Sequence, residues 1–234
     1  DRANRNCKYA CEREARHDRV VDGEGDALLV SEHVAHAVID RCVERELPHE
    51  ELHRAPEASQ RRRWSAAAAQ QDAAAQYQLG LVYATEGVGQ DFVAAAEWLR
   101  KAADQGHPKG HNYIAVLYEE GRGVPQDFSM AVEWWRRAAD HGLADAQDYL
   151  GVMYDNGTGV GRDPEQAFAW YRRSAEQGHA AAQNNLGLMY EIGRGTSLNY
   201  SEALKWYRRS AEQGWAQAMA NLALVYVGGI GVEP

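Results

Sequence analysis

The stretch DPEQAFAWYRRSAEQGH, from Asp163 to His179, occurs four times in this chain in slightly different forms. The other copies are NYSEALKWYRRSAEQGW from Asn199, DFSMAVEWWRRAADHGL from Asp127 and DFVAAAEWLRKAADQGH from Asp91. Equivalent positions are 36 residues apart, as four tryptophans show: Trp98, Trp134, Trp170 and Trp206. A period of roughly 20 to 50 residues is typical of repeat proteins, whose units pack against their neighbours. The sequence therefore predicts a repeat architecture for most of its length.

Each copy carries the signals of one complete helix. Asp163 is a good N-cap residue, because its side-chain oxygen can accept a hydrogen bond from the first helical turn, and Pro164 suits the first helical position. Gly178 is suited to the left-handed conformation after a last turn. Between them, apolar or small residues recur at the spacing of one buried helix face: Ala167, Trp170, Tyr171 and Ser174. We predict this helix in all four copies.

A second, shorter helical pattern precedes each of these helices. It reads AQNNLGLMY where it ends at Tyr190, and similar stretches end at Tyr83, Tyr118, Tyr154 and Tyr226. A small residue lies inside each stretch: Gly80, Ala115, Gly151, Gly187 and Ala223. Glycine within a helix costs about 1 kcal/mol. We therefore expect this position to allow a close approach of the neighbouring helix, beneath its tryptophan ring.

Taken together, the motifs LGxMYxxGxGV, Asp and AxxWYRRSAEQGH resemble the Sel-1-like repeat family, which is related to the tetratricopeptide repeats. The resemblance covers residues 73–234, with four full copies and the opening half of a fifth. It implies an all-α fold, a right-handed α/α superhelical solenoid with two antiparallel helices in each repeat. It also implies a protein-binding adaptor or an assembly factor of a multiprotein complex, membrane-associated complexes included.

Three regions are predicted along the chain. Residues 1–26 form a polar, loosely structured segment, residues 27–72 a helical capping region and residues 73–234 the solenoid. A solenoid needs such a cap because its first repeat would otherwise expose an apolar face. Within the cap, the stretch from Glu57 to Gln71 aligns with the longer helix when Trp64 is set against Tyr171. We interpret this stretch as a degenerate half-repeat.

Composition narrows the classes of function. A hydrophobic content of 45% is typical of a soluble globular chain, and the formal charge of −9 argues against nucleic acid as the main partner. No run approaches the ~18 consecutive apolar residues of a membrane-spanning helix. The sequence does not begin with methionine and ends inside a repeat, so we expect processing or truncation at both ends. The compartment is therefore not predicted, and an organelle reached through a cleaved targeting peptide remains open.

The region before the repeats contains the residues for an alternative function, metal binding. HEELH, from His49 to His53, matches the H-E-x-x-H pattern of zinc metalloproteases. Resemblance to that class ends there, because Pro48 and Pro56 flank a short, charged stretch where those enzymes have a continuous helix. Other candidate ligands are Cys7, Cys11 and His17, and His33, His36 and Asp40 at helical spacing.

Three cysteines, Cys7, Cys11 and Cys42, do not make a disulfide framework, and none lies in the repeats. We interpret the cysteines as ordinary thiols and the histidines as part of a solvated surface. We thus predict no metal and no cofactor. An N-terminal metal-binding module, with the solenoid as its substrate or partner platform, is kept as the alternative.

The repeated basic pairs, such as Arg172 and Arg173, are expected to stack as a ridge along the solenoid, because they recur with the repeat period. Glu176 and its equivalents, four residues after the first member of each pair, are placed to neutralise them. Two interpretations remain open, a solvated surface and a docking ridge for an acidic partner.

No motif of an enzyme is present, since the sequence lacks a Ser-x-x-Lys, a P-loop and a nucleophile elbow. We therefore predict a non-catalytic scaffold that binds protein partners, within a large or membrane-associated assembly in one version of this hypothesis. Helical phase places a set of polar residues on the side of the shorter helices that we expect to be exposed and partner-binding: Gln76, Asn112, Gln147, Asp148, Gln183, Asn184 and Gln217.

Overall fold

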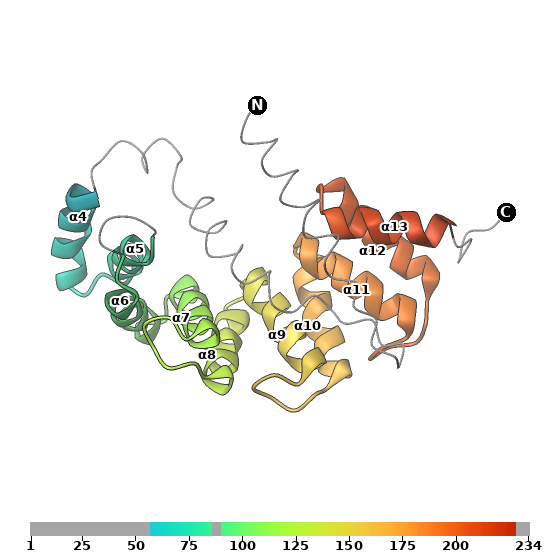
Figure 1. Cartoon of the computed structure of the whole chain (residues 1–234), viewed down its shortest axis with the longest axis horizontal. Helices are drawn as coiled ribbons and strands as arrows, with labels where there is room; N and C mark the ends of the chain where they lie inside the picture. Colours follow the sequence, from blue (N-terminus) through green and yellow to red (C-terminus); the bar gives the residue numbers. More distant parts are fainter. Residues whose placement is uncertain (1–56, 86–89, 228–234) are drawn as a thin grey trace. The chain divides into compact units, whose positions relative to one another are not determined.

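A computed structural model of the chain describes residues 57–85 and 90–227. Within these ranges the chain forms ten α-helices and no strand, so the predicted all-α repeat fold is confirmed (Figure 1). The helices are α4 (Glu57–Ala69), α5 (Ala73–Ala84), α6 (Phe92–Asp104), α7 (Pro108–Glu120), α8 (Phe128–Asp140), α9 (Ala144–Asn156), α10 (Pro164–Glu176), α11 (Ala180–Ile192), α12 (Tyr200–Glu212) and α13 (Ala216–Val227).

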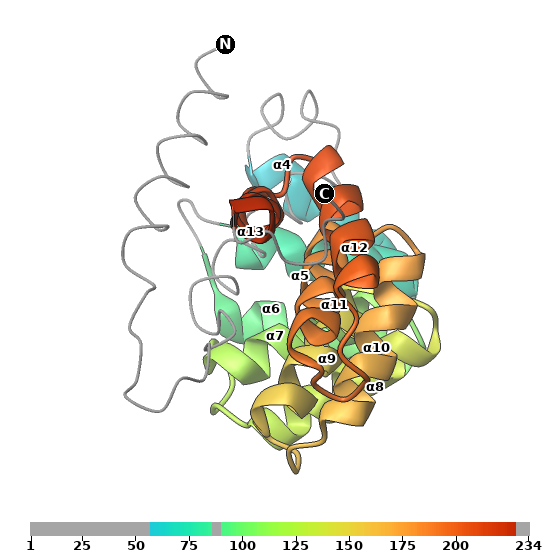
Figure 2. The same ribbon diagram turned by 90° about the vertical axis from the view of Figure 1, so that its right-hand side faces the viewer.

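Each helix packs mainly on the helices next to it in the sequence. The extensive contacts join α4 to α5, α5 to α6 and so on to α12 with α13, and the ribbons follow one another in chain order (Figure 1). Figure 2 shows the same helices turned by 90°. We call α5, α7, α9, α11 and α13 the first helices of their repeats, and α6, α8, α10 and α12 the second helices. The helix predicted from Glu57 is present as α4, and it packs on α5 in the way that a second helix packs on the next repeat.

The predicted N-caps are confirmed. Asp91, Asp127, Asp163 and Asn199 have extended backbones, and each side chain accepts a hydrogen bond from the backbone N–H three residues later. For Asp163 that bond is 3.0 Å long, from the amide of Gln166. The glycine two residues beyond each second helix has a positive φ, +92° at Gly178, which a residue with a Cβ rarely adopts. The chain can therefore turn directly into the next first helix.

The small residues of the first helices do allow close packing, but the ring above them is not the predicted one. A Cβ added to Gly151 would lie 2.5 Å from the ring of Tyr171, and one on Gly187 would lie 2.8 Å from the ring of Tyr207. The tryptophan that precedes each of these tyrosines faces a different neighbour. The expectation of a tryptophan in this place was wrong because adjacent helical residues point about 100° apart, so only one of the two can cover the glycine.

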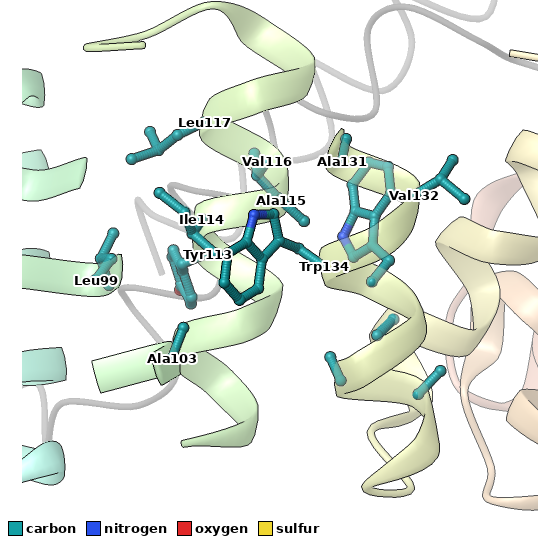
Figure 3. Close-up of a cluster of buried hydrophobic side chains, with 14 of the residues drawn as sticks. Leu99, Ala103, Tyr113, Ile114, Ala115, Val116, Leu117, Ala131, Val132 and Trp134 are labelled. Carbon is teal, nitrogen blue, oxygen red and sulfur yellow. The ribbon is translucent and has the colours of Figure 1, made fainter. Parts of the chain in front are cut away.

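Smaller clusters of buried apolar side chains join α4 to α5, α10 to α11 and α12 to α13, and the largest cluster of the core extends from α5 to α10. Around α7 and α8 it contains Ile114, Ala115 and Leu117 from the first helix and Ala131 and Trp134 from the second, as Figure 3 shows. Trp135, Tyr171 and Tyr207 are fully buried at equivalent positions of three second helices. Burial of such aromatic surface is worth about 25 cal/mol per Å². The solenoid is thus stabilised by the same contact made repeatedly.

Candidate partner-binding surface

Most of the residues predicted to line an exposed binding face are buried. Gln76, Asn112, Gln147, Gln183 and Asn184 are each 5% exposed or less. Helical phase failed here because it treats a polar side chain as a sign of exposure, whereas these five side chains are covered by neighbouring helices. All of them except Asn112 also make hydrogen bonds between helices. The expectation that these five residues are accessible was therefore wrong. The other two residues of the predicted set are accessible to different degrees: Gln217 is exposed, and the side chain of Asp148 is 13% exposed.

The three buried glutamines form a recurring set of bonds that we call the glutamine ladder. The Nε2 atom of Gln147 donates to the carbonyl of Ala139 in the preceding second helix, over 3.2 Å, and its Oε1 accepts from Gln177 over 2.7 Å. The same two bonds recur at Gln76, with Ala68 and Gln105, and at Gln183, with Ala175 and Gln213. Each rung therefore joins three helices, and these glutamines stabilise the stack.

A second polar row links successive first helices. Asn185 on α11 donates to Asp148 on α9, over 3.2 Å, and Asn221 on α13 donates to Asn184 on α11, over 3.0 Å. Because such bonds are made inside or at the edge of the packed structure, they also position neighbouring repeats. No signal in a single sequence distinguishes these asparagines from surface residues, since the partner lies 37 residues away.

Asp145 and Asp148, near the start of α9, lie around His179, and we call these three residues the acidic patch. His179, the N-cap of α11, accepts the amide of Ala182 at Nδ1, so its Nε2 faces Asp145 at 3.1 Å. Its Nδ1 also lies 3.7 Å from Asp148. Burial raises the pKa of Asp148, against the lowering effects of His179 and of the hydrogen bond from Asn185. The patch thus holds two carboxyl groups around one imidazole, with the side chain of Asp145 39% exposed.

Carboxyl groups also recur at the other end of the first helices, where sequence reasoning did not look for them. Asp155, which is 1% exposed, pairs with Arg194 of the next repeat at 3.2 Å. Glu191 accepts a 2.5 Å hydrogen bond from the hydroxyl of Tyr207. At Glu119, burial and then the neighbouring Glu120 raise the pKa to about 7. The shared spacing of 36 residues could have identified this row.

The basic pairs of the second helices are engaged with aromatic rings. The first members Arg100, Arg136 and Arg208 each donate to a tyrosine hydroxyl, of Tyr118, Tyr154 and Tyr226 respectively. The second members lie over the tryptophan three residues earlier, with 4.6 Å between Arg173 and the ring of Trp170. The fourth first member, Arg172, instead forms an ion pair with the acid four residues later, Glu176, at 2.8 Å. The pairs therefore have a packing role that the sequence did not indicate.

The candidate metal ligands fall outside the part of the chain that the structure describes: Cys7, Cys11, His17, His33, His36, Asp40, Cys42, His49 and His53. Across residues 57–85 and 90–227, no three His, Cys, Asp or Glu side chains are grouped so that they could hold a metal ion. The same ranges contain no helix whose length and hydropathy would let it cross a membrane.

The second residue of each first helix stays accessible to solvent to some degree. These positions are Ala74, Lys109, Asp145, Ala181 and Gln217, of which Ala74 and Gln217 are exposed and the other three partly buried. With Asp148 and His179 they form what we call the first-helix surface. The groups around His179 are held in place by contacts with Asp145, Asp148 and the amide of Ala182, which lowers the entropy cost of binding another molecule. No catalytic arrangement is needed for that role.

Comparison with known proteins identifies the type of these repeats. The model of the Sel1 repeat matches residues 73–107, 108–143, 144–179, 180–215 and 216–234. A Sel1 repeat protein from Oxalobacter formigenes is 38% identical, with a TM-score of 0.68, over 74% of this chain and 70% of that chain. None of the curated proteins compared matches this sequence.

A second solved structure is c5321 of Escherichia coli, described as a protective antigen present in uropathogenic strains and displaying an SLR fold. It is also 38% identical and has a TM-score of 0.71, over 74% of this chain. The match spans only 37% of that protein's own length. With five repeat matches covering well over half of the sequence, the chain belongs to the Sel1 repeat family.

Proposed function

We propose that this chain is a non-catalytic scaffold that acts as an adaptor, or as a subunit or assembly factor of a multiprotein complex. Sel1 repeat proteins generally mediate protein–protein interactions. The observation that carries the proposal is the set of ordered, accessible polar groups on the first helices, around Asp145 and His179.

The proposed contact region is the first-helix surface of α9, α11 and α13. Asp145 and Asp148 supply negative charge there, and Gln217 extends the surface by an exposed group that can both donate and accept hydrogen bonds. A partner that presents Lys or Arg side chains matches this arrangement. Charge complementarity of this kind favours one orientation of the partner and increases the rate of association.

Site-specific photo-crosslinking tests the proposal. A photo-reactive amino acid is introduced at position 145 or 217 on the first-helix surface, and at position 212 on the second helix α12 as a matched exposed control. We expect the first two positions, and not the third, to crosslink the same protein in cells that express the chain naturally. Crosslinking from position 212 alone would place the partner elsewhere, and crosslinking from none of them would reject the scaffold role.

The crosslinked protein, once purified, allows a quantitative test. The substitutions Asp145→Lys and Glu212→Lys change the net charge equally but lie on different helices. We expect D145K to weaken binding at least about tenfold, or about 1.4 kcal/mol, and E212K to leave it nearly unchanged. Equal effects would mean that the acidic patch has no specific role in recognition.

A further inference from the structure

One rung of the glutamine ladder is built from two histidines. In three repeats the buried glutamine of the first helix is bonded to the glutamine that caps the second helix. In the remaining full repeat, between α7 and α8, the equivalent residues are His111 and His141. Both ends of this rung differ from the other rungs, so the pair substitutes for the glutamine pair as a unit.

His111 is packed into the joint between repeats, whereas His141, which stacks on it, is exposed to solvent. His111 is 4% exposed, and its ring stacks on that of His141 with 5.7 Å between the centroids and 16° between the planes. It also stacks on the ring of Trp134, with 5.6 Å between the centroids. The ring is hydrogen-bonded to the backbone of Ala103, as the glutamines are to the equivalent alanines, while its Nδ1 is buried without a partner.

Glutamine and histidine differ in one respect that matters at this position. A carboxamide donates and accepts hydrogen bonds without carrying charge, whereas an imidazole does so only while it is neutral. Protonation would place an N–H on the buried Nδ1 of His111, where no acceptor is available, together with a positive charge. Both changes are costly in a buried site.

The groups around His111 do not offset that charge. His107 acts on it from the start of α7, Arg137 from α8 and His141 from the cap of α8, and all three are cations or become cations in acid. On α6, the carbonyl of Ala103 accepts a hydrogen bond from the ring of His111, and this is the one contact among these groups that favours the protonated form. Burial first, and then His141, lower the pKa of His111 below 6.5.

We propose that the rung formed by His111 and His141 is an acid-sensitive joint, which loosens α7 from α6 and α8 as the pH falls below neutrality. Because His111 is less readily protonated in the folded state than in the unfolded chain, its contribution to stability is present above about pH 6.5. That contribution is lost progressively as the pH falls further. The three glutamine rungs keep their bonds over the same range, so the response is confined to one position in the solenoid.

The chain itself supplies the control, the double substitution H111Q/H141Q, which makes this rung like the other three. Melting temperatures are measured at about pH 7.5 and about pH 5.5, on either side of the usual histidine pKa. We expect the unsubstituted chain to lose about 2–4 °C more than the H111Q/H141Q variant over this interval. Equal losses in the two proteins would overturn the proposal, because all other titrating groups are common to both.

Two further measurements keep the test decisive if that variant folds poorly. The double substitution Q147H/Q177H adds a second histidine pair, at another rung, to a chain that keeps His111 and His141. This variant should lose more melting temperature in acid than the unsubstituted chain. In the unsubstituted chain, the amides of α7 should exchange with solvent faster at about pH 5.5 than those of α11, after correction for intrinsic exchange rates. A pKa of 6.5 or above for His111 in an NMR titration, or equal protection of α7 and α11 in acid, would overturn the proposal.

Discussion

Gly151 on α9 lies directly beneath the ring of Tyr171 on α10, so that a Cβ at this glycine would be 2.5 Å from two ring carbons. Tyr171 is fully buried and cannot move aside without disturbing the core of its repeat. The glycine therefore serves helix packing at the expense of helix propensity.

The substitution Gly151→Ala is expected to destabilise the fold by about 1–3 kcal/mol, because the cost of overpacking exceeds the gain in helix propensity. Urea unfolding gives this free energy. Gly161→Ala is the matched control, since a Cβ there would meet nothing within 4 Å. A G151A variant as stable as the G161A variant would mean that α9 and α10 can separate without cost.

Gln147 makes two hydrogen bonds of the glutamine ladder. Gln147→Ala leaves the backbone carbonyl of Ala139 and the side-chain amide of Gln177 without their partner. We expect a loss of about 1–3 kcal/mol in the free energy of unfolding. Gln217→Ala, on the exposed position of α13, should change it by less than about 0.5 kcal/mol. Similar values for the two variants in denaturant titrations would show that the ladder is not a source of stability.

Arg194 neutralises Asp155, whose side chain is almost completely excluded from solvent. Arg194→Ala leaves a buried carboxylate without its partner, which typically costs about 3–5 kcal/mol. Arg173→Ala removes an arginine that lies over Trp170 on an exposed surface, so it serves as the control. Thermal unfolding that is unchanged by R194A would contradict the importance of this ion pair between repeats.

The contribution of Glu119 to the stability of the fold should decrease as the pH rises. Burial and the charge of Glu120 raise its pKa from 4.5 to about 7, so the folded state binds the proton more tightly than the unfolded state. Its stabilising contribution is complete below about pH 4.5 and is lost as the pH passes through about 7. Glu119→Gln keeps the uncharged form, and should be more stable than the original chain at about pH 8 by about 1–3 kcal/mol.

The control for this prediction is Glu212→Gln, which changes an exposed carboxylate on α12 by the same atoms. From about pH 5 to about pH 8, the change in unfolding free energy should be more favourable to the folded state in E119Q than in E212Q, because only E212Q keeps the unfavourable ionisation of Glu119. Identical pH dependence in the two variants would show that the carboxyl of Glu119 ionises without penalty.

The repeats and the capping residues of the second helices could be predicted because the signals are local and occur several times. An N-cap such as Asp163 acts on an amide three residues away, and a buried stripe follows from spacing within one helix. The binding residues could not be predicted in the same way. Gln147 looks like a surface residue in its own helix, and only its bonds to Ala139 and Gln177 reveal that it is structural.

By itself, the sequence determined that this protein is a helical repeat protein of the Sel1 type, since periodic helix signals depend only on residues a few positions apart. The tertiary structure alone decided which polar groups are covered and which are accessible, because that depends on side chains about 30 residues away. It placed Tyr171 over Gly151, turned three glutamines inward and left Asp145 and Gln217 at the surface. In a solenoid, each helix is covered by its neighbours on two sides, so exposure is a property of the stack and not of the single helix.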